Sequence, residues 1–263
     1  FNNYRWRIYQ RSKTVDFKKE DPATWNADDF EKTISTLYTK ALAPATQLQQ
    51  TDLKPYSAII VEGNTKGLRP TLYDLLTHKA LDYFKDVNNY ITRPDYAFEI
   101  KEPAALATAD KFLQHSFKSQ DTASHQLAVL HLFQQLMQFH KADAEPSAFI
   151  DVNLERIEWV YANNIIEDKE TLYKQSLEDI TQAFPGNVNS LQAWYLLAKI
   201  YADKAATYKP FGDTINRYNY TKAKQIIDEQ LKAKPDTSEG KSNMQQLLAD
   251  ILRKEMSTQV ENI

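Results

Sequence analysis

The chain contains very little glycine: 5 of its 263 residues, where roughly 7% is typical of globular proteins. A β-sheet protein of this length needs many tight turns, and several common turn types require the positive φ angles that glycine adopts without strain. The scarcity therefore predicts an all-α fold in which helices are joined by short polar connections.

The first part of the chain has a weaker helical pattern than the rest. A helix is predicted at 28–42, because Phe30, Ile34 and Leu37 share one apolar stripe and Asn26 can cap the first turn. From 44 to 70 the pattern is lost, which predicts a long ordered connection with room for one short strand at 57–61.

From Pro70 onwards the helical pattern is strong. It begins with a ladder of residues four apart, Leu72, Leu76, Ala80 and Phe84, which share one helix face. Asp168 is placed to cap one of the later helices. The further helices are predicted at 106–117, 122–141, 146–163, 169–184, 189–206, 219–234 and 240–257.

The helix predicted at 122–141 has apolar residues on two sides, which is typical of a helix that packs between two neighbours. One stripe contains Leu130, Phe133 and Met137, and the other contains Val129, Leu132, Leu136 and Phe139. Such a helix belongs in a stack of helix pairs.

Residues 194–235 resemble a tetratricopeptide repeat, in which two helices pack through small residues at fixed positions. Trp194, Leu197, Ala198 and Tyr201 match the first helix, with Ala198 at a close-contact position. The second helix and its terminating proline match at Tyr220, Ala223, Ile227, Leu231 and Pro235. The fold expected is thus a tetratricopeptide-like helical-hairpin stack at 106–263, preceded by a less regular helical part at 1–105, with one continuous unit as the alternative.

Composition excludes several classes of function. The chain has no cysteine, so disulfides, thiolate metal sites and thiol catalysis are ruled out. A formal net charge of −3 gives no basic excess for binding nucleic acid. No apolar run approaches the roughly 20 residues of a membrane helix.

Three short words in the first 84 residues resemble the helical region before the macroglobulin domains of large bacterial alpha-2-macroglobulin-like proteins. They are 4–8 (YRWRI), 21–25 (DPATW) and 68–76 (LRPTLYDLL). The resemblance implies a secreted, often lipid-anchored protein of the cell envelope that entraps proteases. The thioester of that family needs a cysteine, so no thioester role passes to any residue of this chain.

Charged and histidine side chains were weighed as metal or catalytic sites. Asp74, His78 and Asp82 follow one another four residues apart, but they lie opposite the Leu72–Phe84 ladder, on a face predicted to be solvated. His125 and His140 flank apolar stripes, which predicts surface or boundary positions. Glu155 and Glu158 are predicted to form part of a charged helix face. No catalytic, cofactor or metal residue is therefore assigned.

The connection between Tyr201 and Tyr220 is about thirteen residues longer than in an ordinary repeat and contains Pro210. It carries aromatic residues and arginine, the composition of a protein interface more than of a flexible linker. The loop either docks on a neighbouring domain or folds back over the stack itself. The candidate interaction residues are Tyr208, Phe211, Arg217 and Tyr218.

The sequence thus favours a non-catalytic interaction module, with protein surfaces as partners and the downstream domains of the same polypeptide as the first choice. One alternative is a glycan-binding surface lipoprotein of the nutrient-uptake type, which also uses tetratricopeptide-like helices. A helical enzyme is disfavoured, because no convergent catalytic set is present. The aromatic and basic segment at 4–9 is expected to anchor the first helix, with stacking on sugars or bases as the alternative.

Overall fold

A computed structural model describes residues 18–61, 63–65, 67–87, 94–209, 211–212, 214–233 and 238–253. Within these ranges it has ten α-helices and no β-strand, and 67% of the residues are helical. The predicted all-α class is confirmed. In chain order the helices are α2 (Ala27–Leu42), α3 (Ala45–Gln49), α4 (Leu72–Lys85), α5 (Ala109–Gln114), α6 (His125–His140), α7 (Ser147–Asn163), α8 (Lys169–Ala183), α9 (Ser190–Ala205), α10 (Asn219–Ala233) and α11 (Glu239–Leu252).

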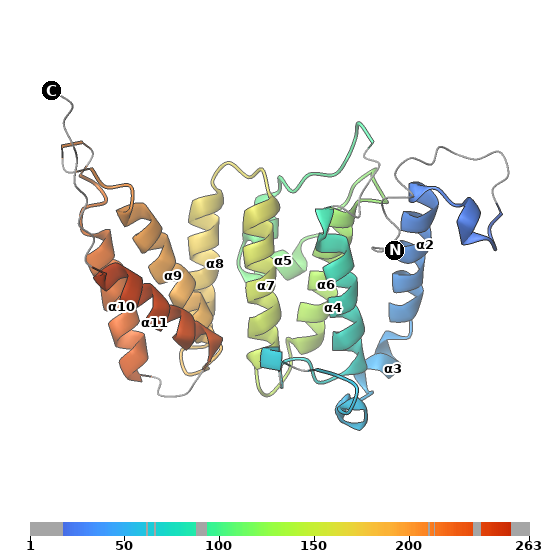
Figure 1. Ribbon diagram of the computed structural model, residues 1–263, viewed down its shortest axis with the longest axis horizontal. Helices are drawn as coiled ribbons and strands as arrows, with labels where there is room; N and C mark the ends of the chain where they lie inside the picture. The colour runs from blue at the N-terminus through green and yellow to red at the C-terminus, as the bar shows by residue number, and fades with distance from the viewer. Residues whose placement is uncertain are drawn as a thin grey trace.

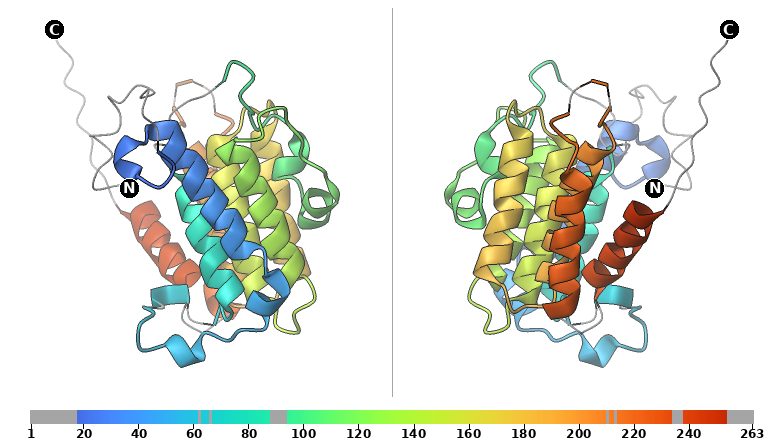
Figure 2. Two further views of the ribbon diagram at one scale, coloured as in Figure 1. Left: turned by 90° about the vertical axis from the view of Figure 1, so that its right-hand side faces the viewer. Right: turned by 90° about the vertical axis from the view of Figure 1, so that its left-hand side faces the viewer.

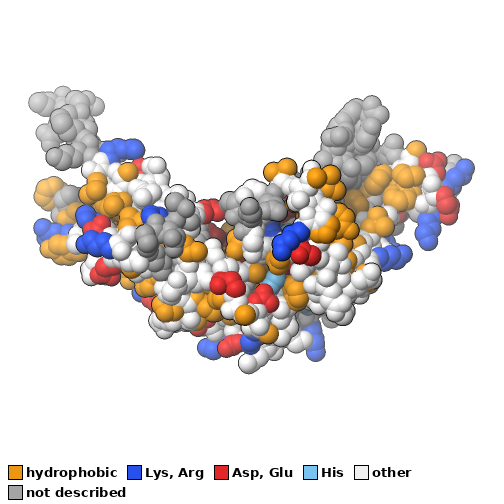
Figure 3. Space-filling view, turned by 90° about the horizontal axis from the view of Figure 1, so that it is seen from below, with side chains coloured by type: hydrophobic (Ala, Val, Ile, Leu, Met, Phe, Trp, Pro, Cys, Tyr) orange, Lys and Arg blue, Asp and Glu red, His pale blue; other side chains and the backbone are white. Residues whose placement is uncertain are grey.

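The longer helices form a row of hairpins (Figure 1). Helices α2 and α3 pack on α4, and the row continues through α6, α7, α8, α9 and α10. Helix α11 packs on both α9 and α10, and Figure 2 shows it inclined to the other helices of the row. The whole stack is curved, as the view from below shows (Figure 3).

Local signals place most of the helix ends. The side chain of Asn26 accepts a hydrogen bond from the backbone N–H of Asp29 at 2.9 Å, and the Asp29 carboxylate accepts one from the N–H of Asn26. This is the reciprocal cap that Asn26 predicts. Asp168 precedes α8, but its side chain makes no capping hydrogen bond, so that prediction is wrong in its detail.

Two predicted elements differ from the structure. Residues 57–61 lie in turns and the end of a connection, not in a strand, and among the described residues they have no strand to pair with. The helix predicted at 106–117 is replaced by a 3₁₀ turn at Pro103–Leu106 and the short α5. The helix predicted to reach 257 is described only to Leu252, and the segment at 4–9, Pro210 and Pro235 lie outside the described residues.

The buried Arg156 explains why the 106–117 segment is broken. Its guanidinium donates to the backbone carbonyls of Ala105 at 2.8 Å and Ala107 at 3.0 Å, and to the side-chain oxygen of Asn153. It also lies over the ring of Phe112, 4.4 Å from the centroid. Carbonyls at the start of a helix normally accept hydrogen bonds from the N–H groups four residues later. Here these two carbonyls accept hydrogen bonds from Arg156 instead. Burial lowers the pKa of Arg156 to about 9, which still leaves it charged at neutral pH.

The hydrophobic core has two parts. The larger contains residues from Leu48 to Leu197 and thus lies on both sides of position 105, the predicted division between two units. The smaller lies between α9, α10 and α11 and includes Ala198, Ala223 and Met244. The division into two units stays a prediction.

Candidate functional site

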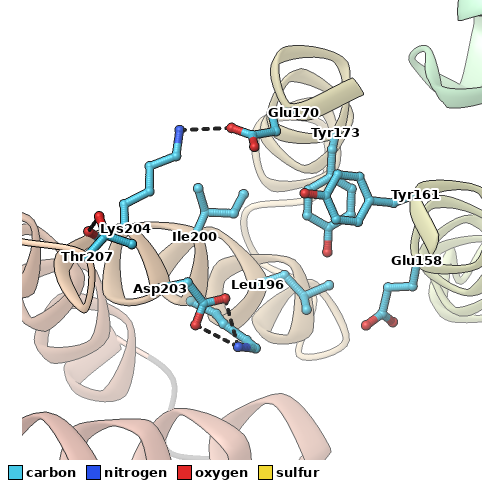
Figure 4. A pocket seen from close by; sticks show the side chains of 10 residues that line it. Glu158, Tyr161, Glu170, Tyr173, Leu196, Ile200, Asp203, Lys204 and Thr207 are labelled. Atoms are coloured by element: carbon cyan, nitrogen blue, oxygen red, sulfur yellow. Dashed lines mark hydrogen bonds and ion pairs between the residues drawn. The ribbon is translucent and has the colours of Figure 1, made fainter. Parts of the chain in front are cut away.

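A pocket of about 440 Å³ lies between α7, α8 and α9, close to where α9 leads into the long loop (Figure 4). Its wall is apolar on one side. The rings of Tyr161 and Tyr173 stack with centroids 4.1 Å apart, and Leu196 and Ile200 of α9 line it as well. The pocket can therefore receive an aromatic or aliphatic group.

The rim of the pocket is charged, and most of its charges are paired. Lys199 donates to Asp203 at 2.8 Å, and Lys204 lies 3.3 Å from Glu170; Figure 4 draws both pairs. Glu158 of α7 also points toward the pocket, and no ion pair to it is drawn there. The rim thus keeps one carboxylate whose charge the neighbouring rim residues do not balance.

The predicted interaction loop begins at the same end of the pocket. Lys204 and Thr207 line the pocket, and the base of the loop is closed by a hydrogen bond of 3.0 Å from Asn216 to the hydroxyl of Thr207. The loop therefore has an ordered stem beside the pocket.

The tip of the loop presents apolar side chains to solvent. Phe211 is fully exposed, and Ile215 and Tyr218 are largely exposed. The guanidinium of Arg217 lies 5.4 Å from the centroid of the Tyr218 ring, and Tyr208 is half-buried. Of the two predicted arrangements, a loop folded back over the stack would bury Phe211 and Tyr218, whereas a docking loop leaves them free.

The face of α4 that carries Asp74 and His78 is buried, so the prediction that it is solvated is wrong. Asp74 is 0% exposed and His78 is 5% exposed, whereas Asp82 is exposed. The ladder residues Leu72 and Leu76 are only half-buried. Asp74 and His78 are buried because charged side chains of α6 and α7 pair with them.

His140 at the end of α6 is the partner of Asp74. Its Nε2 lies 2.7 Å from Asp74, and its Nδ1 lies 2.7 Å from Asp143. Ionised carboxylates accept hydrogen bonds and cannot donate them, so two such partners favour a proton on both ring nitrogens, which is the imidazolium form. His140 and His125 are both buried, which corrects the prediction of surface or boundary positions.

We expect the free energy of unfolding to fall as the pH rises from about 6.5, the pKa of an unfolded histidine, through the raised folded pKa of His140. Burial alone would lower that pKa, but the hydrogen bonds and charges of Asp74 and Asp143 outweigh it, and the pKa is raised. The stabilisation is therefore complete below the unfolded pKa of about 6.5, and it is lost as the pH rises through the folded pKa and His140 loses its proton.

Urea unfolding of wild type and two variants between pH 6 and 9 measures this effect. His140→Gln should flatten the pH dependence, whereas His131→Gln should keep it, because His131 faces the carbonyl of Phe117 and not a carboxylate. If the free energy of unfolding depends on pH equally in the wild type and in His140→Gln, the proposed role of His140 is contradicted.

Glu155 of α7 is half-buried and belongs to a charged network. It forms ion pairs with Lys85 and His78, and Arg69 lies 3.8 Å away. Burial opposes its ionisation, but His78 and Lys85 lower its pKa to about 2. This network joins α4 to α7 across a sequence separation that no local pattern reveals.

The described residues contain no group of three or more His, Cys, Asp or Glu side chains that could hold a metal ion. None of their helices is long and apolar enough to span a membrane. Sequence reasoning missed the pocket, because Tyr161, Tyr173 and Leu196 come from three different helices. Comparison of the chain with protein-family models, curated proteins and solved structures found no match.

Proposed function

We propose that this chain is a non-catalytic, tetratricopeptide-like module that binds protein surfaces through the loop between α9 and α10. The observation that carries the proposal is the loop itself, where the side chains of Phe211, Ile215 and Tyr218 are exposed. Exposed aromatic groups of this kind are typical of protein interfaces.

The partner that we propose is a neighbouring domain of the same polypeptide. This choice rests on the resemblance of the words at 4–8, 21–25 and 68–76 to bacterial alpha-2-macroglobulin-like proteins. In that setting the chain is an accessory module of an envelope protein that entraps proteases, and its role is to hold the helical part against the domains that follow.

Replacing Tyr208, Phe211 and Arg217 together by alanine should separate docking from internal packing. Because Phe211 is exposed and the guanidinium of Arg217 lies over the loop's own Tyr218 ring, we expect the melting temperature to change by less than about 3 °C. Association with the remainder of the polypeptide, measured by isothermal titration calorimetry, should weaken by roughly tenfold or more.

The matched control is Tyr96→Ala, which removes an exposed aromatic ring from a distant loop and should leave both quantities unchanged. If the triple variant loses many degrees of thermal stability by itself, the loop is an internal lid and the proposal fails.

A further inference from the structure

The pocket beside the loop has a second cavity next to it along α7 and α9, and we call the two cavities together the α7–α9 groove. The second cavity, of about 600 Å³, continues along the same two helices toward their N-terminal ends. Glu158 lines both cavities, so they meet at this side chain. Counted along α7 from Ser147 to Tyr161, the α7–α9 groove is about 21 Å long at 1.5 Å per residue.

Most carboxylates of the second cavity are already neutralised or hydrogen-bonded. Asp151 lies 3.6 Å from Arg69, and Glu155 is paired with Lys85. Glu145 accepts hydrogen bonds from Ser147 and Asn187. These contacts hold the walls of the groove together.

Glu158 differs from these carboxylates. Among the described residues it has neither an ion pair nor a hydrogen bond. It is exposed to solvent at the junction of the two cavities. Burial by the surrounding walls raises its pKa, and the like charges of Glu239 and Glu155 raise it further. A positive charge placed here would therefore meet a carboxylate that has no described counter-charge.

The apolar half of the groove lies directly beside this carboxylate. Tyr161 is three residues beyond Glu158 on α7 and therefore lies on the same face of the helix, and its ring is stacked on Tyr173. Leu196 and Ile200 complete the apolar wall on α9. A ligand that satisfies both halves needs a cationic group next to an apolar one.

We propose that the α7–α9 groove binds an extended segment of a partner protein in which lysine or arginine stands next to an aromatic or branched aliphatic residue. The basic side chain pairs with Glu158, and the apolar side chain enters the pocket between Tyr161, Tyr173 and Ile200. The groove has room for roughly six residues of extended chain at about 3.3 Å each. This inference deepens the proposed function and rests on it, because it assumes that the partner is a protein.

A selection of random 12-residue peptides displayed on phage tests the chemistry of the groove. We expect peptides enriched on the wild-type chain to carry lysine or arginine within two positions of an aromatic or branched aliphatic residue. Binding of the most enriched peptide, synthesised with a fluorophore, is then followed by fluorescence anisotropy. Glu158→Gln should weaken it about fivefold, the upper range for one solvent-accessible ion pair.

The matched control is Glu99→Gln, which removes the charge of another exposed glutamate on the loop before α5 and should leave peptide binding unchanged. No enrichment, enriched peptides without basic residues, or equal binding by Glu158→Gln would overturn the inference. The inference would also be overturned if the wild type sediments as a dimer and Glu158→Gln sediments as a monomer, because the groove would then bind a second copy of the chain.

The loop variant separates this inference from the proposed function. The variant with alanine at Tyr208, Phe211 and Arg217 should bind the peptide as the wild type does, since none of the three lines the groove. If that variant no longer binds the peptide while Glu158→Gln still binds it, the loop is the binding surface and only the groove inference fails. If the peptide binds the groove but the loop variant associates normally with the rest of the polypeptide, the loop proposal fails alone.

Discussion

Replacing Arg156 by methionine should lower the free energy of unfolding by about 3–5 kcal/mol. Arg156 is completely buried and supplies the hydrogen bonds of two backbone carbonyls, those of Ala105 and Ala107, and of the Asn153 side chain. Methionine has a similar length but no donor, so these three oxygens would stay buried without partners. Lysine would replace only part of the planar fork, and Arg156→Lys should therefore be intermediate.

Urea unfolding followed by circular dichroism measures this loss. The control is Arg253→Met, which removes an exposed arginine whose described partner is Asp250 and should cost less than about 0.5 kcal/mol. A single ordinary hydrogen bond contributes about 1 kcal/mol. If the free energy of unfolding of Arg156→Met lies within about that amount of the wild-type value, Arg156 does not organise the 103–109 segment.

Replacing Gly240 by alanine should detach α11 from α9, at a cost of about 3 kcal/mol. A β-carbon at this position would lie 2.3 Å from the backbone nitrogen of Gln192 and 2.5 Å from the carbonyl carbon of Leu191. Backbone atoms in the first turn of α9 cannot move aside as a flexible side chain can, so α11 must shift. The shift would also break the hydrogen bond from Asn243 to Gln192.

Hydrogen exchange locates this effect in the chain. In Gly240→Ala the amides of α11 should lose protection, while those of α6 and α7 keep it, because these helices belong to the larger core. Gly186→Ala is the matched control, since no atom lies within 4 Å of the added carbon. Unchanged protection of α11 would show that the two helices tolerate the extra methyl group and are less closely packed than the structure has them.

The helical class and most helix positions follow from the sequence, because the apolar period is a local property. Helix α2, for example, begins beside its predicted cap Asn26. Ala198 and Ala223, which match small positions of the repeat pattern, are fully buried in the smaller core, and the repeat pattern itself stays a prediction. Gly240 was not predicted as a contact residue, because its neighbour Gln192 lies on another helix.

The buried polar contacts could not be predicted from local patterns. Asp74 has its partner His140 66 residues away, and a helix face that carries two carboxylates and a histidine normally faces water. The helix predicted at 106–117 is interrupted for the same kind of reason, because the carbonyls of Ala105 and Ala107, on either side of its predicted start, bind Arg156 of α7. The apolar pocket likewise forms only when α7, α8 and α9 are brought together.

Site-specific photo-crosslinking tests most directly whether the loop docks on another part of the protein. Benzoylphenylalanine is placed at position 211 of the full-length polypeptide in its native host, and the cross-linked peptides are identified by mass spectrometry. Position 96, another largely exposed aromatic residue, carries the same group as a control. Docking predicts that position 211 cross-links to discrete peptides of the same polypeptide outside residues 1–263, and that position 96 does not. Cross-links from position 211 that reach only α9 and α10, or a pattern equal to that from position 96, would contradict it.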